Sequence, residues 1–290
     1  MPHRAPGGAD SLRPTRTADS RTLVTEVRTT MIEFRNVTKT YHNGDGRKKT
    51  VILDDISLSI GSGEFVCVLG PSGCGKTTLL NLVAGFVLPN SGEMFFNGKK
   101  IERPGPERAV VFQDPTLFPW LTVRQNVMFG LCLDKSSRHC CREISHRYLE
   151  ITGLLESADA FPFALSGGMR QRVSLARVLA LDPGVLLMDE PFSALDANTR
   201  EHLQDELLKL WNSYPRTVVY VTHSVGEAAY LADRIVVLDG SGNIRKDMPI
   251  DLPRPRNRSS QELLELKSSL RTQLANLPCC IMRTGKKRRS

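Results

Sequence analysis

The chain has 290 residues, of which 40% are hydrophobic and 24% charged, a composition typical of a globular protein with a substantial core. No apolar run approaches the roughly 18 residues of a membrane span, and the polar N-terminus does not fit a secretory signal, so we expect a cytosolic protein. The formal net charge is +8, but residues 240–290 alone hold twelve Lys or Arg against four acidic residues. Residues 1–30 add five Arg against three acidic residues, which leaves residues 31–239 at −2, so a nucleic-acid-binding core is not expected.

The pattern along the chain divides it into three regions. Residues 1–30 are polar and aperiodic, and we interpret them as a disordered extension, with Met31 as a hypothetical native start. Residues 31–240 alternate strand and helix signals, except for an inserted, mostly helical subdomain at about 114–165. Residues 241–290 form a basic tail, partly helical or disordered, in which "QELLELKSSLRTQL" has helical spacing.

Strand signals come first in chain order. Residues 31–41 and 52–60 alternate apolar and polar side chains, and Asn97-Gly98 within 93–101 predicts a hairpin. Short apolar runs at 64–70, 108–113, 185–190, 217–223 and 234–240 are typical of buried parallel strands. Helical patterns at 76–86, 195–214 and 225–233 separate them. The result is an α/β fold with a mainly parallel sheet and an antiparallel β subdomain.

The stretch "GPSGCGKTT" fits the phosphate-binding loop (P-loop) pattern GxxxxGK[ST] in full. It follows a predicted strand and opens a predicted helix, as the motif requires, so we expect the core of a P-loop NTPase. Its glycines let backbone N–H groups approach phosphate oxygens, and the helix start adds a positive dipole end. Lys76 is expected to reach the β- and γ-phosphates and Thr77 to bind Mg²⁺. The predicted nucleotide contacts are Gly70, Pro71, Ser72, Gly73, Cys74, Gly75, Lys76, Thr77 and Thr78.

The run "VLLMDE" supplies carboxylates at the end of a predicted strand. Asp189 is expected to join the magnesium shell. Glu190 is expected to face the γ-phosphate and to polarise the attacking water, a general-base role worth roughly 10²–10⁴ in rate.

A second glycine-containing loop, "LSGGMRQR" at 165–172, also precedes a predicted helix. Together with the P-loop, Gln113 in "VVFQD", "LLMDEP", "SALD" and His223 in "VTHS", it makes residues 31–240 resemble the nucleotide-binding subunit of an ATP-binding-cassette (ABC) transporter. The motifs occur in the order found in that family. The resemblance implies a magnesium-dependent ATPase, with ATP and Mg²⁺ as its ligands.

The resemblance also implies individual roles. Tyr41 would stack on the adenine ring, Gln113 would touch Mg²⁺ and the γ-phosphate, and His223 would hold Glu190 and water in place. The catalytic set would be Glu190, His223, Lys76 and Gln113, and the metal ligands Thr77, Gln113 and Asp189.

The resemblance further explains why the chain has two phosphate-binding loops. In this family two subunits pair head to tail, and the "LSGG" loop of one subunit contacts the ATP held by the P-loop of the other. Such a homodimer has two equivalent sites. The residues expected at this contact are Ser166, Gly167, Gly168 and Gln171, with Asp196 at the subunit boundary.

Two further stretches narrow the resemblance to the nitrate/sulfonate/taurine group of bacterial importers. They are "LFPWLTV", which contains Phe118, Pro119 and Trp120, and "DLPRPRNR". The aromatic stretch would form a groove for a membrane permease, although core packing of Trp120 is an alternative. Separate permease and solute-binding subunits would place the chain on the cytoplasmic side of the membrane as a peripheral subunit. The solute would be a small anion or organosulfonate; an exporter ATPase or a soluble ABC protein is the alternative.

The seven cysteines include no CxxC pair and no metal-ligand spacing. Cys74 lies inside the P-loop, where N–H groups lower the pKa of a thiol and favour its reactivity. We therefore hypothesise that alkylation of Cys74 blocks ATP binding.

Overall fold

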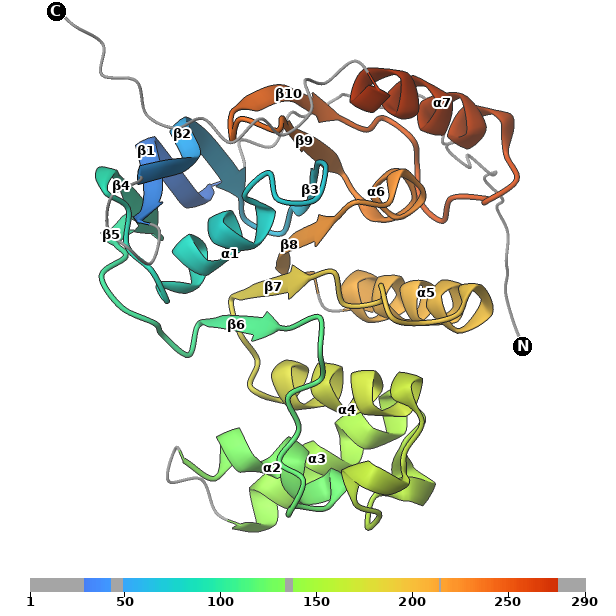
Figure 1. Cartoon of the computed structure of the whole chain (residues 1–290). Coiled ribbons are helices and arrows are strands. Elements are labelled where there is room, and N and C mark those ends of the chain that lie inside the picture. The colour runs from blue at the N-terminus through green and yellow to red at the C-terminus, as the bar shows by residue number, and fades with distance from the viewer. Residues whose placement is uncertain (1–28, 43–48, 134–137, 214, 276–290) are drawn as a thin grey trace, which may run out of the picture.

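The computed structural model describes residues 29–42, 49–133, 138–213 and 215–275 (Figure 1). Its central element is a six-stranded sheet with the order β10-β9-β3-β8-β7-β6. Five strands run parallel, as their apolar runs predict: β9 (Arg234–Leu238), β3 (Phe65–Leu69), β8 (Thr217–Thr222), β7 (Val185–Asp189) and β6 (Arg108–Val111). The mainly parallel sheet of a P-loop NTPase is thus confirmed.

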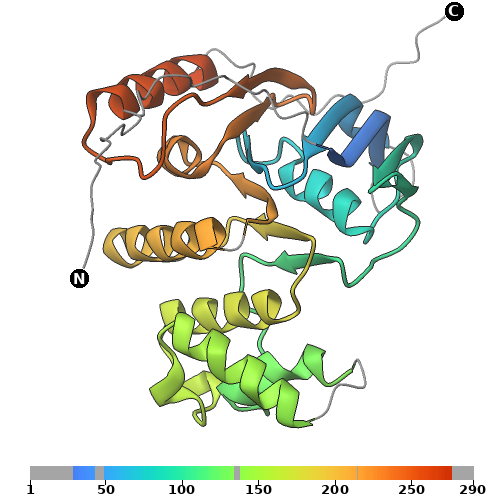
Figure 2. The same cartoon turned by 180° about the vertical axis from the view of Figure 1, so that it is seen from behind.

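Alternate side chains of the parallel strands enter two separate cores. In β3, Val66 and Val68 pack on the side of α1 (Lys76–Ala84), whereas Phe65, Cys67 and Leu69 pack on the opposite side. The opposite side is covered by α5 (Ala197–Ser213) and α6 (Val225–Leu231), as Figures 1 and 2 show. Burial on both faces explains why these strands are continuously apolar rather than alternating.

An antiparallel sheet with the order β2-β1-β4-β5 covers α1 from its other side. It consists of β1 (Thr30–His42), β2 (Lys49–Gly61), β4 (Ser91–Phe96) and β5 (Lys99–Lys100). Asn97 and Gly98 connect β4 to β5 with φ values of 48° and 71°, the left-handed pair that a two-residue hairpin requires. The antiparallel subdomain and its hairpin are therefore as the sequence indicates.

The helical subdomain extends further than the predicted limits of 114–165. It contains α2 (Val123–Leu131), whose N-terminus is closed by a capping box of Thr122 and Gln125, and α3 (Arg138–Ile151). Two short 3₁₀ turns, Leu155–Ser157 and Pro162–Ala164, lead to α4 (Gly167–Ala180). Val173, Ala176 and Ala180 of α4 complete the core of α2 and α3, while Leu175 and Val178 of the same helix enter the core of the main sheet. The helix therefore belongs to the subdomain and joins it to the sheet.

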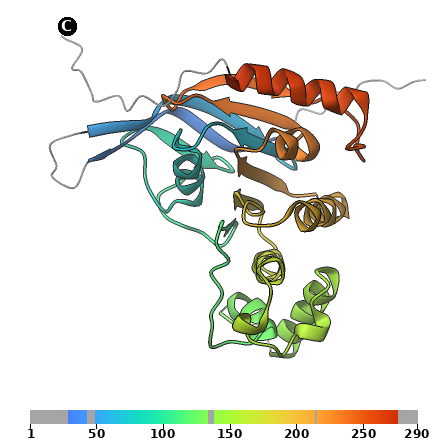
Figure 3. The ribbon, with the colours of Figure 1, turned by 45° about the vertical axis from the view of Figure 1, so that its right-hand side comes forward.

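The folded domain also continues past residue 240, where the sequence analysis ends it. The strand β10 (Ile244–Pro249) pairs antiparallel with β9 at the sheet edge. Beyond it, α7 (Gln261–Ala275) lies beside α6 and buries Leu263 and Leu270 in the core (Figure 3). The many basic residues of this region indicated a tail outside the folded domain, although two of its leucines are buried. Of the extension predicted to be disordered, 1–30, residues 1–28 lie outside those described, while Thr30 already begins β1; residues 276–290 of the predicted tail also lie outside them.

Among the described residues, no helix combines the length and apolarity needed to cross a bilayer.

Candidate functional site

The P-loop spans the gap between the end of β3 and the start of α1. Gly75 precedes the helix with φ of 100°, and Gly73 has φ of 80°. A Cβ atom on Gly75 would lie 2.8 Å from Leu53 Cδ2 and 2.9 Å from the Ile52 carbonyl oxygen, distances that no side chain tolerates. Glycine is therefore needed here for its conformation and for its small size.

Lys76 folds back into the loop that carries it. Its Nζ donates to the carbonyl oxygens of Gly70 and Pro71, both at 2.9 Å, and lies 3.9 Å from Glu190 Oε1. These contacts hold a positive charge at the centre of the loop, beside the N-terminus of α1. The arrangement suits a polyphosphate, because the lysine and the helix dipole attract the same anion.

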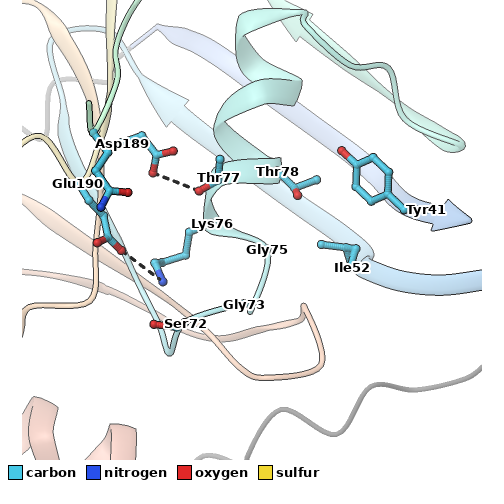
Figure 4. A pocket seen from close by; sticks show the side chains of 11 residues that line it. Tyr41, Ile52, Ser72, Gly73, Gly75, Lys76, Thr77, Thr78, Asp189 and Glu190 are labelled. Carbon is cyan, nitrogen blue, oxygen red and sulfur yellow. Dashed lines mark hydrogen bonds and ion pairs between the residues drawn. The ribbon is translucent and has the colours of Figure 1, made fainter. Parts of the chain in front are cut away.

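Asp189 lies at the end of β7, and its Oδ1 accepts a hydrogen bond of 3.2 Å from Thr77 Oγ1 (Figure 4). Burial raises the pKa of Asp189, and the bond from Thr77 opposes that rise. A carboxylate and a hydroxyl that face each other are the hard oxygen ligands that Mg²⁺ prefers. The two predicted metal ligands therefore fit the ion.

Glu190 follows directly and adopts φ of 44°, an uncommon conformation for a residue with a side chain. Its N–H donates to the Val221 carbonyl oxygen at 3.0 Å, which joins the backbone after β7 to β8. Its Oε2 lies 2.9 Å from Nδ1 of His223. A carboxylate oriented by a histidine, with a lysine beyond it, is the geometry expected of a general base at the end of a phosphate chain.

Lys76, Thr77, Asp189 and Glu190 line an open pocket of about 440 Å³, large enough for a small ligand. His223 does not line it but contacts Glu190. In Figure 4, Tyr41 lies at the end opposite Asp189 and Glu190. The pocket thus brings together residues from β1, the P-loop, β7 and the segment after β6. The predicted residues that line it are Tyr41, Ser72, Gly73, Gly75, Lys76, Thr77, Thr78, Gln113, Asp189 and Glu190.

One lining residue escaped the sequence analysis, and the Cys74 thiol of the P-loop is buried. Ile52 of β2 reaches the pocket beside Tyr41 (Figure 4), although the alternating pattern of residues 52–60 predicted only a strand. The Cys74 side chain is 1% exposed and packs in the core of α1. This burial argues against the hypothesis of a reactive P-loop thiol, because reactivity requires access as well as a low pKa.

The second glycine loop lies apart from this pocket. Ser166 caps α4 by accepting a hydrogen bond of 3.2 Å from the Met169 N–H, while Ser166 and Gly167 are exposed. A Cβ on Gly168 would lie 3.1 Å from Thr199 Cγ2, so the loop adjoins the start of α5. Its exposed helix N-terminus is open to an anion from outside the chain.

Two further predicted contacts are engaged within the chain. Gln171 is 3% exposed, and its amide donates to the Phe112 carbonyl oxygen at 3.4 Å, which ties α4 to the residue before Gln113. It is therefore a connection between subdomains in this structure rather than a surface contact. Asp196 accepts a hydrogen bond of 3.0 Å from the Thr199 N–H and so caps α5; this bond lowers its pKa.

Comparison with known proteins agrees with this geometry. Residues 53–193 match the protein family described as ABC transporter. The bicarbonate transport ATP-binding protein CmpD of Synechococcus elongatus is 47% identical over 227 residues, which cover 77% of this chain and 81% of that protein. The chain belongs to the ABC transporter family.

Two other similarities bear on this ABC ATPase. The nitrate import ATP-binding protein NrtD of Synechococcus elongatus is 43% identical over 81% of this chain and 86% of that protein. The dimeric, post-hydrolysis structure of the ATP-binding cassette MJ0796, bound to ADP and Pi, superposes with a TM-score of 0.68 at 33% identity and covers 77% of this chain and all of that one. The chain is accordingly an enzyme that couples ATP hydrolysis to transport, and the P-loop pocket is its candidate ATP site.

The aromatic stretch after Gln113 lies at the surface of the helical subdomain of this ABC ATPase. Trp120 is 69% exposed, which rules out the alternative that it packs in the core. Its ring centroid lies 5.7 Å from that of Phe118, which in turn lies 4.4 Å from that of Phe129. The cluster is a solvent-facing aromatic surface of a kind that is enriched at protein interfaces.

Proposed function

We propose that this ABC ATPase works as a homodimer that energises import of a small inorganic anion through a separate membrane permease. The main support for a dimer is that the two phosphate-binding loops of one chain lie apart from each other. The P-loop pocket is open, while Ser166 and Gly167 present the N-terminus of α4 to the outside of the same chain. A second copy related by a two-fold axis would bring each loop to the other's pocket.

In the proposed reaction, the P-loop N–H groups and Lys76 hold the β- and γ-phosphates of ATP. Thr77 and Asp189, with Gln113 beside them, would hold Mg²⁺, which would neutralise phosphate charge. Glu190 accepts the proton of the attacking water, and His223 orients Glu190 and donates to the γ-phosphate.

The second glycine loop, residues 165–172, is called the signature loop below. It would complete this site from the partner subunit. Ser166, Gly167 and Gly168 of one subunit would donate hydrogen bonds to the γ-phosphate held by Lys76 of the other. Asp196 and the loop before α5 would lie at the boundary between the two sites. Loss of the γ-phosphate removes the link, so the dimer opens after hydrolysis.

Substitution of Ser166 by Arg tests the dimer. Because Ser166 does not line its own pocket, the variant should bind ATP as tightly as the wild type when measured with a fluorescent nucleotide. The arginine would obstruct the partner's γ-phosphate, so sedimentation should show no ATP-dependent dimer and turnover should cease. An ATP-dependent dimer of normal stability would contradict the proposal.

The importer assignment has two supports. The relatives named for bicarbonate and nitrate are 47% and 43% identical to this chain, and the Phe118–Trp120 stretch offers a surface for permease subunits. We therefore place the chain at the cytoplasmic face of the membrane as a peripheral subunit that meets the solute-binding protein only through the permease. Bicarbonate or nitrate is favoured over a sulfonate such as taurine.

Uptake measurements in the native host decide between these solutes and between import and export. Deletion of the chain should abolish uptake of radiolabelled bicarbonate or nitrate, and plasmid-borne wild type, but not a Glu190→Gln variant, should restore it. Loss of taurine uptake alone would identify a sulfonate importer. Accumulation of a solute inside the deletion strain would instead identify an exporter.

A further inference from the structure

A buried carboxylate lies behind the catalytic residues and has no role in the reaction described above. Glu227 belongs to the first turn of α6 and is 6% exposed. Its carboxylate accepts hydrogen bonds from Thr222 Oγ1 at 2.6 Å, Tyr220 Oη at 3.1 Å and Gln204 Nε2 at 3.4 Å. A buried charge is costly unless it is satisfied in this way, so the cluster is held in one arrangement.

One side of the cluster braces the backbone around His223. Thr222 precedes this histidine; its hydroxyl donates to Glu227 Oε2 and accepts from the Ser224 N–H at 3.0 Å. The Ser224 hydroxyl in turn accepts from the Glu227 N–H at 3.4 Å and caps α6. The residues on both sides of His223 are thereby fixed to Glu227, and the histidine reaches Glu190 from this support.

The other side of the cluster reaches the loop Pro191–Asp196, which joins Glu190 to α5. Arg200 Nε lies 3.9 Å from Glu227 Oε1 and donates to the Phe192 carbonyl oxygen at 3.2 Å. Arg200 Nη2 donates to the Leu195 carbonyl oxygen at 2.6 Å. One guanidinium therefore holds two carbonyl groups of the loop while its charge faces the buried carboxylate.

We propose that Glu227 is a positioning residue that couples the orientation of His223 to the conformation of the loop Pro191–Asp196. Its two oxygens take different partners: Oε2 holds the strand end that carries the histidine, and Oε1 faces the arginine that holds the loop. The inference rests on the proposed function, in which His223 acts on the γ-phosphate and this loop lies at the subunit boundary. A change in the conformation of this loop would therefore change the orientation of His223 in the same chain.

The experiment replaces Glu227 by Gln, which keeps the shape but places a neutral amide where the carboxylate accepts from Thr222 and faces Arg200. We expect kcat for ATP hydrolysis to fall about tenfold or more, while ATP affinity, measured with a fluorescent nucleotide, stays within about twofold. In a Glu190→Gln background the variant should need several times more ATP to form the dimer. Glu227→Asp, which keeps the charge, should recover part of the loss in kcat.

The matched control is Asp205→Asn. Asp205 also joins α5 to α6, by accepting from Tyr230 Oη at 2.7 Å, but it touches neither His223 nor the loop. An equal loss of kcat in both variants, or an unchanged kcat in Glu227→Gln, would refute the coupling. If Glu227→Gln fails to fold, Arg200→Lys gives the same test, because lysine keeps the charge but cannot hold both carbonyl groups. Rapid hydrolysis by Glu190→Gln alone would instead overturn the proposed function.

Discussion

At the scale of single residues, the proposed ATP site depends on a few side chains and on unusual backbone at two of its turns. Gly75 takes a conformation and a close approach that exclude any Cβ, and Glu190 takes a positive φ that turns its carboxylate toward Lys76 and His223. Such local strain persists where the surrounding structure determines it, and here β8 does so through the bond from Glu190 to Val221.

The role of Glu190 predicts a large kinetic effect from a small chemical change. Glu190→Gln should lower kcat by roughly 10²–10⁴ because an amide cannot accept the proton of the attacking water. ATP binding should persist, so the variant should accumulate as an ATP-bound dimer on a sizing column. Glu201→Gln, an exposed carboxylate on α5, serves as the control and should hydrolyse ATP at the wild-type rate. Normal turnover by Glu190→Gln would show that another group is the base.

The burial of Cys74 predicts a specific order of thiol reactivity. In the native protein, iodoacetamide should label the exposed Cys132 and Cys140 while it leaves Cys74 unmodified, because the Cys74 side chain is 1% exposed. Peptide mass mapping before and after denaturation measures this order. Rapid native labelling of Cys74 with loss of ATP binding would restore the hypothesis of a reactive P-loop thiol.

At the scale of elements, the apolar runs specify the parallel strands well, but contacts between elements decide where subdomains end. The helix α4 begins with the signature loop, and its apolar side chains enter both the core of α2 and α3 and, through Leu175 and Val178, the core of the main sheet. In the same way α7 belongs to the main core, since Leu263 and Leu270 pack against α6 and the sheet. Periodicity indicates that these segments are helices, but it does not indicate what they pack against.

The packing of α7 can be tested with neighbouring leucines. Leu263→Ala and Leu270→Ala should each lower the free energy of unfolding by about 2–5 kcal/mol, because each removes a fully buried side chain. Leu264→Ala is the control, since this leucine is 48% exposed, and it should cost less than about 1 kcal/mol. Urea titration followed by circular dichroism gives the three values. Equal small costs would mean that α7 is not part of the domain core.

At the scale of the whole molecule, the chain divides into a sheet-based part that holds the P-loop and a helical part that presents Ser166. Figures 1 and 2 show α2, α3 and α4 grouped together beyond the β6 edge of the sheet, and the buried Gln171 ties this group to the segment that carries Gln113. Each chain thus carries two different halves of the proposed site, and both would be needed for one hydrolysis event.

This division predicts that two inactive variants restore each other's activity. Lys76→Ala removes the P-loop charge and Ser166→Arg blocks the signature loop, so homodimers of either should not hydrolyse ATP. A mixed dimer contains one site built from the intact Lys76 of one chain and the intact Ser166 of the other. Mixing the variants should therefore recover measurable ATPase activity in a phosphate-release assay. No recovery at any ratio, with mixed dimers demonstrated by differential tags, would argue that both sites must be intact or that the loops act within one chain.

The sequence by itself determined the parallel sheet and predicted the residues of the candidate ATP site that it carries. It could do so because a phosphate-binding loop needs glycine, lysine and threonine at fixed spacing, and because strands buried on both faces must be apolar throughout. Only the tertiary structure decided that Ile52 lines the pocket, that Cys74 is buried and that the domain continues to Ala275. It also revealed the contacts of Glu227 with Thr222 and Arg200. These features depend on contacts between segments far apart in the chain, which local spacing does not encode.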